Sequence, residues 1–137
     1  MLPAGADLQD AFEVRRQVFQ VEQGIDTARD FDGQDEAADQ MVAYLDEQPV
    51  GTARIRYLDN GDAKIERMAV LRANRGKTYG LVIMQHIFDH LRSKGVAVVS
   101  LESQLSAAPF YEKLGFQKEG AVFEEVGIPH IKMTMKL

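Results

Sequence analysis

The sequence predicts an α+β fold in which a central mixed, mostly antiparallel sheet is flanked by helices. Strand-like residues at 41–45 and 50–58 flank turn residues at 48–49, and Asn-Gly-Asp at 60–62 is a strong hairpin signal before a third strand at 63–70. These segments predict an antiparallel meander. An amphipathic helical pattern precedes the meander, and helical and strand-like segments alternate after it, which predicts a βαβ crossover.

Two longer segments carry helical periodicity. In the first, apolar residues recur every three or four positions over about residues 7–23, and Gly24 follows at the place where helices commonly end. The second runs from the loop at 75–80 to about Lys94 and ends at Gly95. Its apolar side chains fall on one side of the helix, which we expect to face the core: Met84, Ile87, Phe88 and Leu91.

The later segments are shorter. Residues 96–101 form a continuous apolar run, which predicts a central strand buried on both faces. A helix at about 107–114 closes at Gly115, and residues 128–135 supply a late strand. The crossover helix between the third strand and residues 96–101 completes the βαβ unit.

The composition excludes several classes of protein. The chain has 137 residues, which fits one domain over 1–137, and its 45% hydrophobic and 27% charged residues are ordinary for a globular protein. The formal net charge of −5 argues against binding nucleic acid through phosphate contacts, and the lack of Cys excludes disulfides, thiolate nucleophiles and Cys-ligated metals. No apolar run could span a membrane and no signal peptide is evident, so we expect a cytoplasmic protein without membrane or nucleic-acid partners.

No metal site is expected. His86 and His90 are four residues apart on a helix, but Ile87 stands where the H-E-x-x-H motif needs Glu. The acidic stretch at 30–39 has Asp35 where a calcium-binding EF-hand loop needs Gly. This stretch is either an ordinary solvated loop or a local field that attracts amines.

The loop at 75–80, Arg-Gly-Lys-Thr-Tyr-Gly, joins a strand to a helix and has the composition of an anion cradle. Glycines let backbone N–H groups approach a ligand, the helix N-terminus adds partial positive charge, and two cations reinforce it. The alternative is an ordinary loop at a helix start with solvated charges. A nucleotide-binding P-loop would need Gly in place of Leu71, and no G-x-G-x-x-G fingerprint is present.

This loop resembles the cofactor motif of the GNAT superfamily of acetyl-CoA-dependent N-acyltransferases. That motif is Arg or Gln, two residues, Gly, one residue, then Gly or Ala, set between a strand and a helix. Arg75 and Gly80 match it, and Gly76 fits the frequent Arg-Gly opening. Thr78 replaces the middle Gly, so it must accept the backbone angles that a Gly would take.

A second segment is similar to the family's Asn-x-x-Ala-x-x-x-Tyr-x-x-x-Gly-Phe pattern. It comprises Gln104 at the usual Asn position, Ala107 and residues 110–116. Three further segments are similar to a bacterial GNAT branch whose members are mostly of unknown substrate: 16–22, 51–54 and 127–130. The family usually opens with a β-strand, for which residues 1–6 leave room for a vestige at most.

The resemblance implies an N-acetyltransferase that transfers an acetyl group from acetyl-CoA directly to a primary amine. The alternative is a catalytically inactive module that binds CoA or acyl-CoA. In the family, the strand before the phosphate loop splays from its parallel neighbour and the pantetheine arm fills the gap. The residues expected to bind the cofactor are Met68, Val70, Arg75, Gly76, Lys77, Thr78, Tyr79, Gly80, Gln104 and Ala107.

Two residues are candidates for proton transfer. Tyr111 matches the position where the family places a general acid for the departing thiolate, and its alternative role is a packed core aromatic. Glu66 shares strand parity with Met68 and Val70, so it is expected on their face beside the thioester. It could serve as the general base if burial raises its pKa, and its alternative is an outward charge on a half-exposed strand.

Two further residues are candidates for contact with the acceptor, which the resemblance implies is a small-molecule or peptide amine. Glu22 lies in an apolar helical stripe that also holds Arg15, and it could hold a cationic amine or form a structural ion pair. His130 follows Gly-Ile-Pro near a strand start and is a candidate substrate contact. Dimers are common in the family, so a homodimer is compatible with the sequence.

Overall fold

The computed structural model of the protein describes residues 2, 7–27 and 31–137, and within them six strands form one sheet in the order β1-β2-β3-β4-β6-β5. Only β3 and β4 pair in parallel, while the other neighbours are antiparallel. The predicted mixed, mostly antiparallel sheet is therefore confirmed. The strands are β1 (Asp39–Leu45), β2 (Gln48–Tyr57), β3 (Ala63–Val70), β4 (Val98–Gln104), β5 (Gln117–Glu125) and β6 (Ile128–Lys136).

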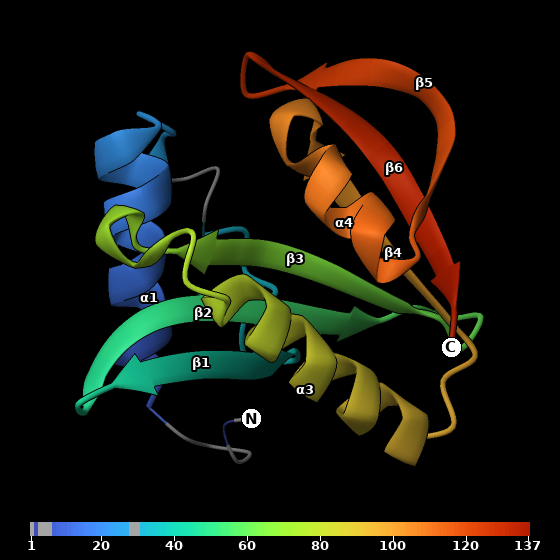
Figure 1. Cartoon of the computed structure of the whole chain (residues 1–137), viewed down its shortest axis with the longest axis horizontal. Helices are drawn as coiled ribbons and strands as arrows, with labels where there is room; N and C mark the ends of the chain where they lie inside the picture. Colours follow the sequence, from blue (N-terminus) through green and yellow to red (C-terminus); the bar gives the residue numbers. More distant parts are fainter. Residues whose placement is uncertain (1, 3–6, 28–30) are drawn as a thin grey trace.

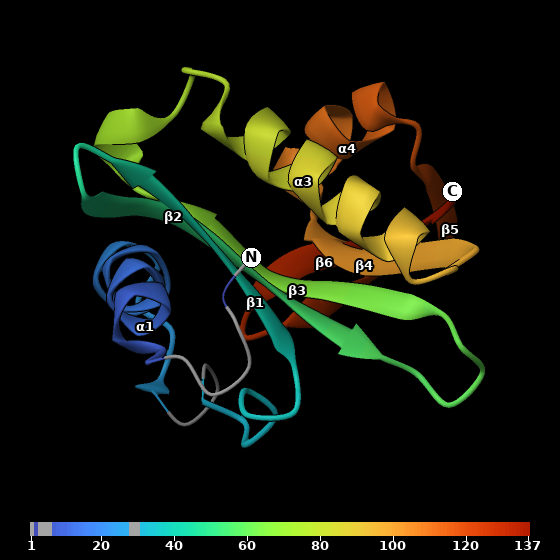
Figure 2. The same cartoon turned by 90° about the horizontal axis from the view of Figure 1, so that it is seen from below.

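Helices cover the two faces of the sheet unequally (Figure 2). On one face lies α1 (Gln9–Arg15), which continues as the π-helix η1 (Arg16–Glu22), so the helix predicted over 7–23 is confirmed. On the other face lie α3 (Tyr79–Ser93) and α4 (Ala108–Leu114), which confirm the other two predicted helices. None of the described helices has the length and hydropathy needed to cross a bilayer.

Short 3₁₀ turns precede both helices of the second face. The turn η2 (Arg72–Asn74) lies between β3 and α3, and η3 (Leu105–Ala107) lies between β4 and α4. The path β3–α3–β4 is the predicted βαβ crossover, because it joins the two parallel strands. Both turns thus stand at the same end of the sheet, at the ends of the two parallel strands.

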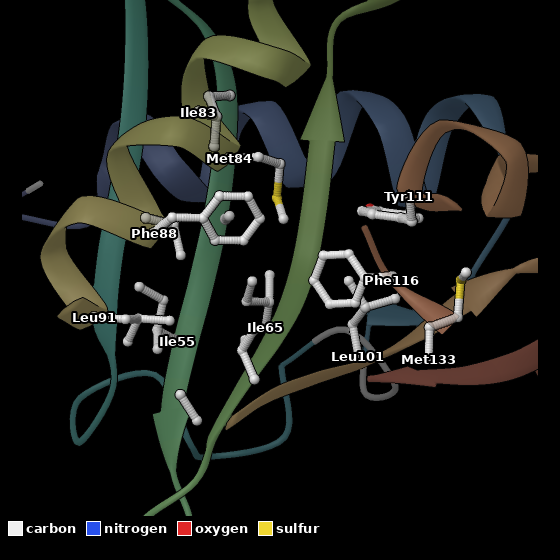
Figure 3. Close-up of a cluster of buried hydrophobic side chains, with 14 of the residues drawn as sticks. Ile55, Ile65, Ile83, Met84, Phe88, Leu91, Leu101, Tyr111, Phe116 and Met133 are labelled. Carbon is white, nitrogen blue, oxygen red and sulfur yellow. The ribbon is translucent and has the colours of Figure 1, made fainter. Parts of the chain in front are cut away.

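The main apolar core lies between the sheet and the pair α3 and α4 (Figure 3). The predicted apolar side of α3 is buried there, as expected from its periodicity. Strands contribute Ile55, Ile65 and Leu101, and Tyr111 and Phe116 lie in the same cluster. On the opposite face the apolar cluster is small, comprising Val14, Val18, Phe19 and Ala69.

Three details of the strands were predicted incorrectly. The β1–β2 turn is at Asp46 and Glu47, both at positive φ, so Pro49 lies inside β2 and not in the turn. The strand predicted at 96–101 runs later, and its alternating burial shows one buried face instead of two. Strand β5 was not predicted. Every residue of it except Phe123 is exposed, so the strand lacks the apolar alternation by which strands are recognised.

The N-terminal segment is described only at Leu2. Its amide donates a hydrogen bond to the carbonyl oxygen of Gln40 at 2.8 Å, beside β1. The expectation for a vestigial first strand otherwise falls on residues 1 and 3–6, which lie outside the described residues.

Candidate active site

Strands β3 and β4 pair over a short distance and then separate. Their parallel ladder joins Ala63 to Val99 and Ile65 to Leu101, after which both strands continue without further pairing among the described residues. Figure 1 shows the two parts of the sheet fanning apart beyond this ladder. A cleft of about 890 Å³ opens at the split and is lined by both strands, by the loop before α3 and by α4. The splay expected from the family resemblance is therefore present.

The cleft has two walls of different chemistry. We call the first the apolar wall: Met68, Val70, Tyr79, Gly80, Ala107, Phe110 and Tyr111. We call the second the ionic wall: Asp32, Lys64, Glu66, Arg67 and Glu102. The apolar wall is continuous with the main core, into which Met68, Val70 and Phe110 pack.

A β-bulge in β3 separates the two walls. Thr52 pairs with Ala69 and Arg54 pairs with Glu66, so two residues of β3 stand opposite the single residue between them in β2. The first of the two, Arg67, has a φ of 55°, which interrupts the alternation of side chains. The extra residue moves Met68 to the core face with Ile65 and leaves Glu66 on the α1 face. The expectation that Glu66 shares a face with Met68 and Val70 is therefore wrong.

The loop before α3 adopts the backbone that its sequence suggested. Gly76 has a φ of 76°, and Thr78 has a φ of 68° and a ψ of 0°, so this Thr takes the left-handed angles that a Gly would take. Gly80 is the second residue of α3, and a Cβ at this position would lie 3.3 Å from Cζ of Phe110. The absence of a side chain at Gly80 thus keeps the first turn of α3 close to α4. Lys77 is exposed and does not line the cleft.

Arg75 connects this loop to the helix on the opposite face. Its Nε donates to the carbonyl oxygen of Val70 at 3.0 Å, and its two terminal nitrogens donate to the Glu22 carboxylate at 2.5 and 2.7 Å. The hydrogen bonds from Arg75 lower the pKa of Glu22, and the pKa of Arg75 is raised in turn. Glu22 therefore forms the structural ion pair that the sequence left open, and it holds the loop to η1.

Gln104 forms a second connection across the cleft. Its side-chain amide donates to Oε1 of Gln23 at 2.9 Å, and Gln23 donates back at 3.4 Å. Because Gln104 ends β4 and Gln23 follows η1, this pair joins the strand to the helix on the α1 face. Ala107, which the family motif also contains, lines the cleft at the end of η3.

Glu66 is surrounded by cations. Arg54 donates to its Oε1 at 2.9 Å, Arg56 donates to the same oxygen at 2.5 Å, and Nζ of Lys64 is 3.5 Å from Oε2. Burial opposes the charged carboxylate, but the hydrogen bond from Arg56 and the charges of Arg54 and Lys64 prevail and lower its pKa. A base role for Glu66 required a raised pKa, so this requirement is not met.

Arg54 is the centre of the ionic network behind this wall. It is 0% exposed, and its two terminal nitrogens bond the Asp32 carboxylate at 2.7 and 2.8 Å. Asp35 lies 3.3 Å from the same guanidinium and 2.5 Å from Arg15, which is also 0% exposed. The acidic stretch is therefore not an ordinary solvated loop, because these two aspartates bind buried arginines.

The sequence indicated that Arg15 needs a partner, but it did not indicate which one. The partners are set by tertiary contacts over roughly twenty residues, as in the pairs Arg15–Asp35 and Arg54–Asp32. The hydrogen bonds from Arg54 hold the pKa of Asp32 well below its ordinary range, against the effect of burial. Arg54, behind the cleft, is thus the residue that sequence reasoning missed, and the pairing of Asp32 with it was not predicted.

Tyr111 reaches the cleft from α4 and is 7% exposed. Its ring packs edge-on against Phe110 at 5.1 Å and against Phe116 at 5.8 Å between centroids. Burial raises the pKa of the phenol well above its ordinary value, so the hydroxyl keeps its proton at neutral pH. The residue therefore combines core packing with a protonated hydroxyl in the cleft wall.

His130 reaches the cleft from β6 and is 8% exposed. It stands directly opposite Gln104 of β4 in the antiparallel ladder, and the Phe123 ring stacks on it at 5.9 Å with an interplanar angle of 25°. Its Nδ1 is 2.7 Å from the carbonyl oxygen of Ile128. The histidine is thus a fixed member of the cleft. No group of three or more His, Cys, Asp or Glu among the described residues could hold a metal ion.

Comparisons with known proteins agree with this architecture. The sequence profile of the acetyltransferase (GNAT) domain matches residues 9–137. The uncharacterised protein YyaT of Bacillus subtilis (strain 168) is 38% identical over 135 residues, which cover 96% of this chain and 90% of YyaT.

Two solved structures share the fold. The crystal structure of Escherichia coli ElaA superposes with a TM-score of 0.84 at 30% identity, over 93% of this chain and 88% of that one. An acyl-CoA N-acyltransferase from Pseudomonas aeruginosa also has a TM-score of 0.84, at 26% identity, over 96% of this chain and 93% of that one. Members of the GNAT family use acetyl-CoA as the acyl donor. The profile match spans nearly the whole chain, and the protein therefore belongs to the GNAT acetyltransferase family.

Proposed function

We propose that this protein is an N-acetyltransferase that transfers the acetyl group of acetyl-CoA directly to a primary amine of a small molecule or peptide. The observation that carries the proposal is the continuous cleft that leads from the loop at 75–80, through the split between β3 and β4, to Tyr111. The likeness to an acyl-CoA N-acyltransferase over most of both chains supports the same activity.

The residues of the cleft fit acetyl-CoA. The loop backbone turns at Gly76 and Thr78, and N–H groups at the first turn of α3 have no intrahelical acceptor, so they suit a diphosphate. Among the described residues, nothing pairs with the β4-facing edge of β3 beyond Ile65, so backbone groups of Met68 and Val70 could bond a pantetheine arm as a ladder partner. When bound, acetyl-CoA supplies the thioester carbonyl that the amine attacks.

The reaction needs one base and one acid. The amine nitrogen bonds to the thioester carbon, the carbon–sulfur bond breaks, one proton leaves the nitrogen and one proton ends on the sulfur. We assign the acid role to the Tyr111 hydroxyl, because the residue lines the cleft and matches the family's tyrosine. Burial raises the pKa of a phenol and of a thiol alike, so the two groups remain matched where the sulfur is held beside the Tyr111 ring.

The test combines binding with turnover. Titration calorimetry with acetyl-CoA is expected to show one saturable site, and a panel of polyamines, aryl-alkyl amines and peptide amines is expected to include one that drives thiol release. Binding without amine-dependent thiol release would instead support the CoA-binding module. Saturable ATP binding with no acetyl-CoA binding would contradict both.

One variant tests where the diphosphate binds. Gly80→Glu should abolish acetyl-CoA binding, because a side chain there meets Phe110 and places a negative charge at the start of α3. Gln85→Glu is the matched control: it adds the same charge to an exposed position of the same helix, outside the cleft, and should leave binding unchanged. Undiminished affinity in Gly80→Glu would mean that the phosphates bind elsewhere.

A further inference from the structure

His130 has a fixed tautomer. A carbonyl oxygen can only accept a hydrogen bond, so the 2.7 Å contact between Nδ1 and the oxygen of Ile128 places the ring proton on Nδ1. In the neutral ring the lone pair is then on Nε2. Nε2 has no partner among the described residues, while the ring itself lines the cleft. The lone pair is therefore available to a ligand there.

The position of the ring is also fixed. The ring of Phe123, from β5, stacks on the imidazole, and the hydrogen bond from Nδ1 to the carbonyl oxygen of Ile128 holds the imidazole within β6. The next residue, Ile131, packs into the main core with α3 and α4, so His130 faces the opposite side of the sheet. Gln104, its ladder partner, bonds to Gln23 after η1 on that same side.

Tyr111 and His130 thus reach one cleft from opposite faces of the sheet. Tyr111 packs in the core between α4 and the sheet, whereas His130 lies on the face of the sheet that α1 covers. A thioester held in the split would have a proton donor on one face and a proton acceptor on the other. Acyl transfer needs one group that accepts a proton from the attacking nitrogen and another that gives a proton to the departing sulfur, and this arrangement keeps the two groups apart.

We propose that His130 Nε2 is the general base of the reaction, an inference that rests on the proposed N-acetyltransferase function. Nε2 accepts a proton from the ammonium form of the acceptor, which frees the nitrogen lone pair for attack. The second proton on that nitrogen passes to solvent water as the amide forms, and Tyr111 gives its proton to the departing thiolate. The imidazolium and the phenolate are then restored by exchange with solvent, so the net products are the amide and the thiol.

Among the residues that the structure describes, four carboxylates line the cleft beside His130, of which Glu125 is an exposed side chain at the end of β5 and the other three are held by cations. Glu66 is held by Arg54 and Arg56, and Asp32 is held by Arg54. Glu102 lies near Lys64, whose Nζ is 3.3 Å from its Oε1. Asp32, Glu66 and Glu102 are thus each paired with a cation, whereas an imidazole is the side chain that most readily accepts a proton near neutral pH.

The charged groups on the strands packed against His130 are few. Glu102 on β4 and Lys132 on β6 form the next ladder pair along the sheet, and Glu124 and Glu125 end β5 beside the hairpin turn.

The test uses His130→Asn. The Asn amide can replace Nδ1–H as the donor to Ile128, but it provides no base at the position of Nε2. With an amine that the wild type acetylates, we expect kcat/KM near pH 7 to fall by about 100-fold, with acetyl-CoA affinity unchanged by calorimetry. In place of the acid limb of the wild-type pH profile, kcat/KM of the variant should rise by about tenfold per pH unit. The reason is that the acceptor amine must then lose its proton without a base from the protein.

Two controls keep the outcome clear. His86→Asn removes the exposed histidine of α3 and should leave both the rate and the pH profile unchanged. Long-range proton–nitrogen NMR of the wild type should show the Nδ1–H tautomer for His130, and an Nε2–H tautomer would overturn the proposal without any variant.

The failures of the two proposals can be told apart. If the wild type releases thiol but His130→Asn keeps the wild-type rate and acid limb, the base role is wrong and the N-acetyltransferase function stands. If the wild type binds acetyl-CoA and no amine of the panel releases thiol, the proposed function is wrong and the base role falls with it.

Discussion

Tyr111 in the apolar wall and Glu66 in the ionic wall border the same cleft, but they are held by different forces. Tyr111 is fixed by packing against Phe110 and Phe116, and no described residue bonds its hydroxyl. Glu66 is fixed by hydrogen bonds from Arg54 and Arg56. The apolar wall leaves the Tyr111 hydroxyl free for chemistry, whereas the ionic wall uses its charges to hold its own side chains.

This difference has energetic consequences. Apolar contacts are individually weak and add up over a large area, so a conservative change in the apolar wall removes little. A buried ionic network has a large effect on stability when it is broken, because removing one member leaves its partners charged and unpaired in a medium of low dielectric. We therefore expect the ionic wall to govern stability and its pH dependence, and the apolar wall to govern the rate of the reaction.

The largest effect is expected at Arg54. Arg54→Met keeps much of the side-chain volume but leaves Asp32, Asp35 and Glu66 without their common cation. We expect a loss of about 3–5 kcal/mol in the free energy of unfolding, measured by urea denaturation at neutral pH. Arg56→Met is the matched control, because Arg56 is 30% exposed in its side chain and its loss should cost about 1 kcal/mol or less. Equal losses in the free energy of unfolding in the two variants would show that the contribution of the network to stability does not depend on the burial of Arg54.

The next effect concerns the rate. Tyr111→Phe removes a hydroxyl and almost no packing surface, so the free energy of unfolding should change by less than about 1 kcal/mol. If the hydroxyl protonates the leaving thiolate, kcat should fall by about 10- to 100-fold while the affinity for acetyl-CoA is kept. A kcat equal to that of the wild type would leave Tyr111 a packing residue only. The measurement is steady-state thiol release together with calorimetry.

The third prediction is the pH dependence of stability. The hydrogen bonds from Arg54 hold the pKa of Asp32 well below its unfolded value, so the stabilisation is present above about pH 4 and is lost as the pH falls below it. Urea midpoints should therefore fall steadily between about pH 4.5 and 2.5, and Asp32→Asn should reduce this dependence without removing it, because the pKa values of Asp35 and Glu66 are lowered as well. Ile87→Val, in the apolar core, should cost about 1 kcal/mol at every pH in that range. A pH dependence that Asp32→Asn leaves intact would place the titrating group elsewhere.

The apolar wall and the core behind it could be predicted from the sequence because their signals are local. The loop at 75–80, the apolar side of α3 and Gly115 after α4 each depend on residues within a few positions, and the structure confirms these elements. The left-handed angles of Thr78 followed from its place in the motif. Matching Tyr111 to the family's tyrosine needed only the spacing within one segment.

The ionic wall could not be predicted, because its geometry depends on distant partners. Arg67 takes a positive φ without being Gly, and this unmarked bulge reversed the face on which Glu66 was expected. The pairing of Asp32 with Arg54 spans 22 positions and has no periodic signature.

Strand β5 could not be predicted either, for a different reason. It is exposed along almost its whole length, so it lacks the apolar alternation by which strands are recognised.

The smallest effect is expected at Thr78, beside the apolar wall. A β-branched residue at a φ of 68° costs roughly 1 kcal/mol, and Gly relieves this cost while adding freedom to the unfolded chain. Thr78→Gly should therefore raise the free energy of unfolding by only about 0.5 kcal/mol, equally at pH 7 and pH 4, since no charge is involved. Thr78→Ala keeps the positive φ and should give no gain. If Ala stabilised the protein as much as Gly, the strain would come from the branched side chain packing in the loop and not from its backbone angles.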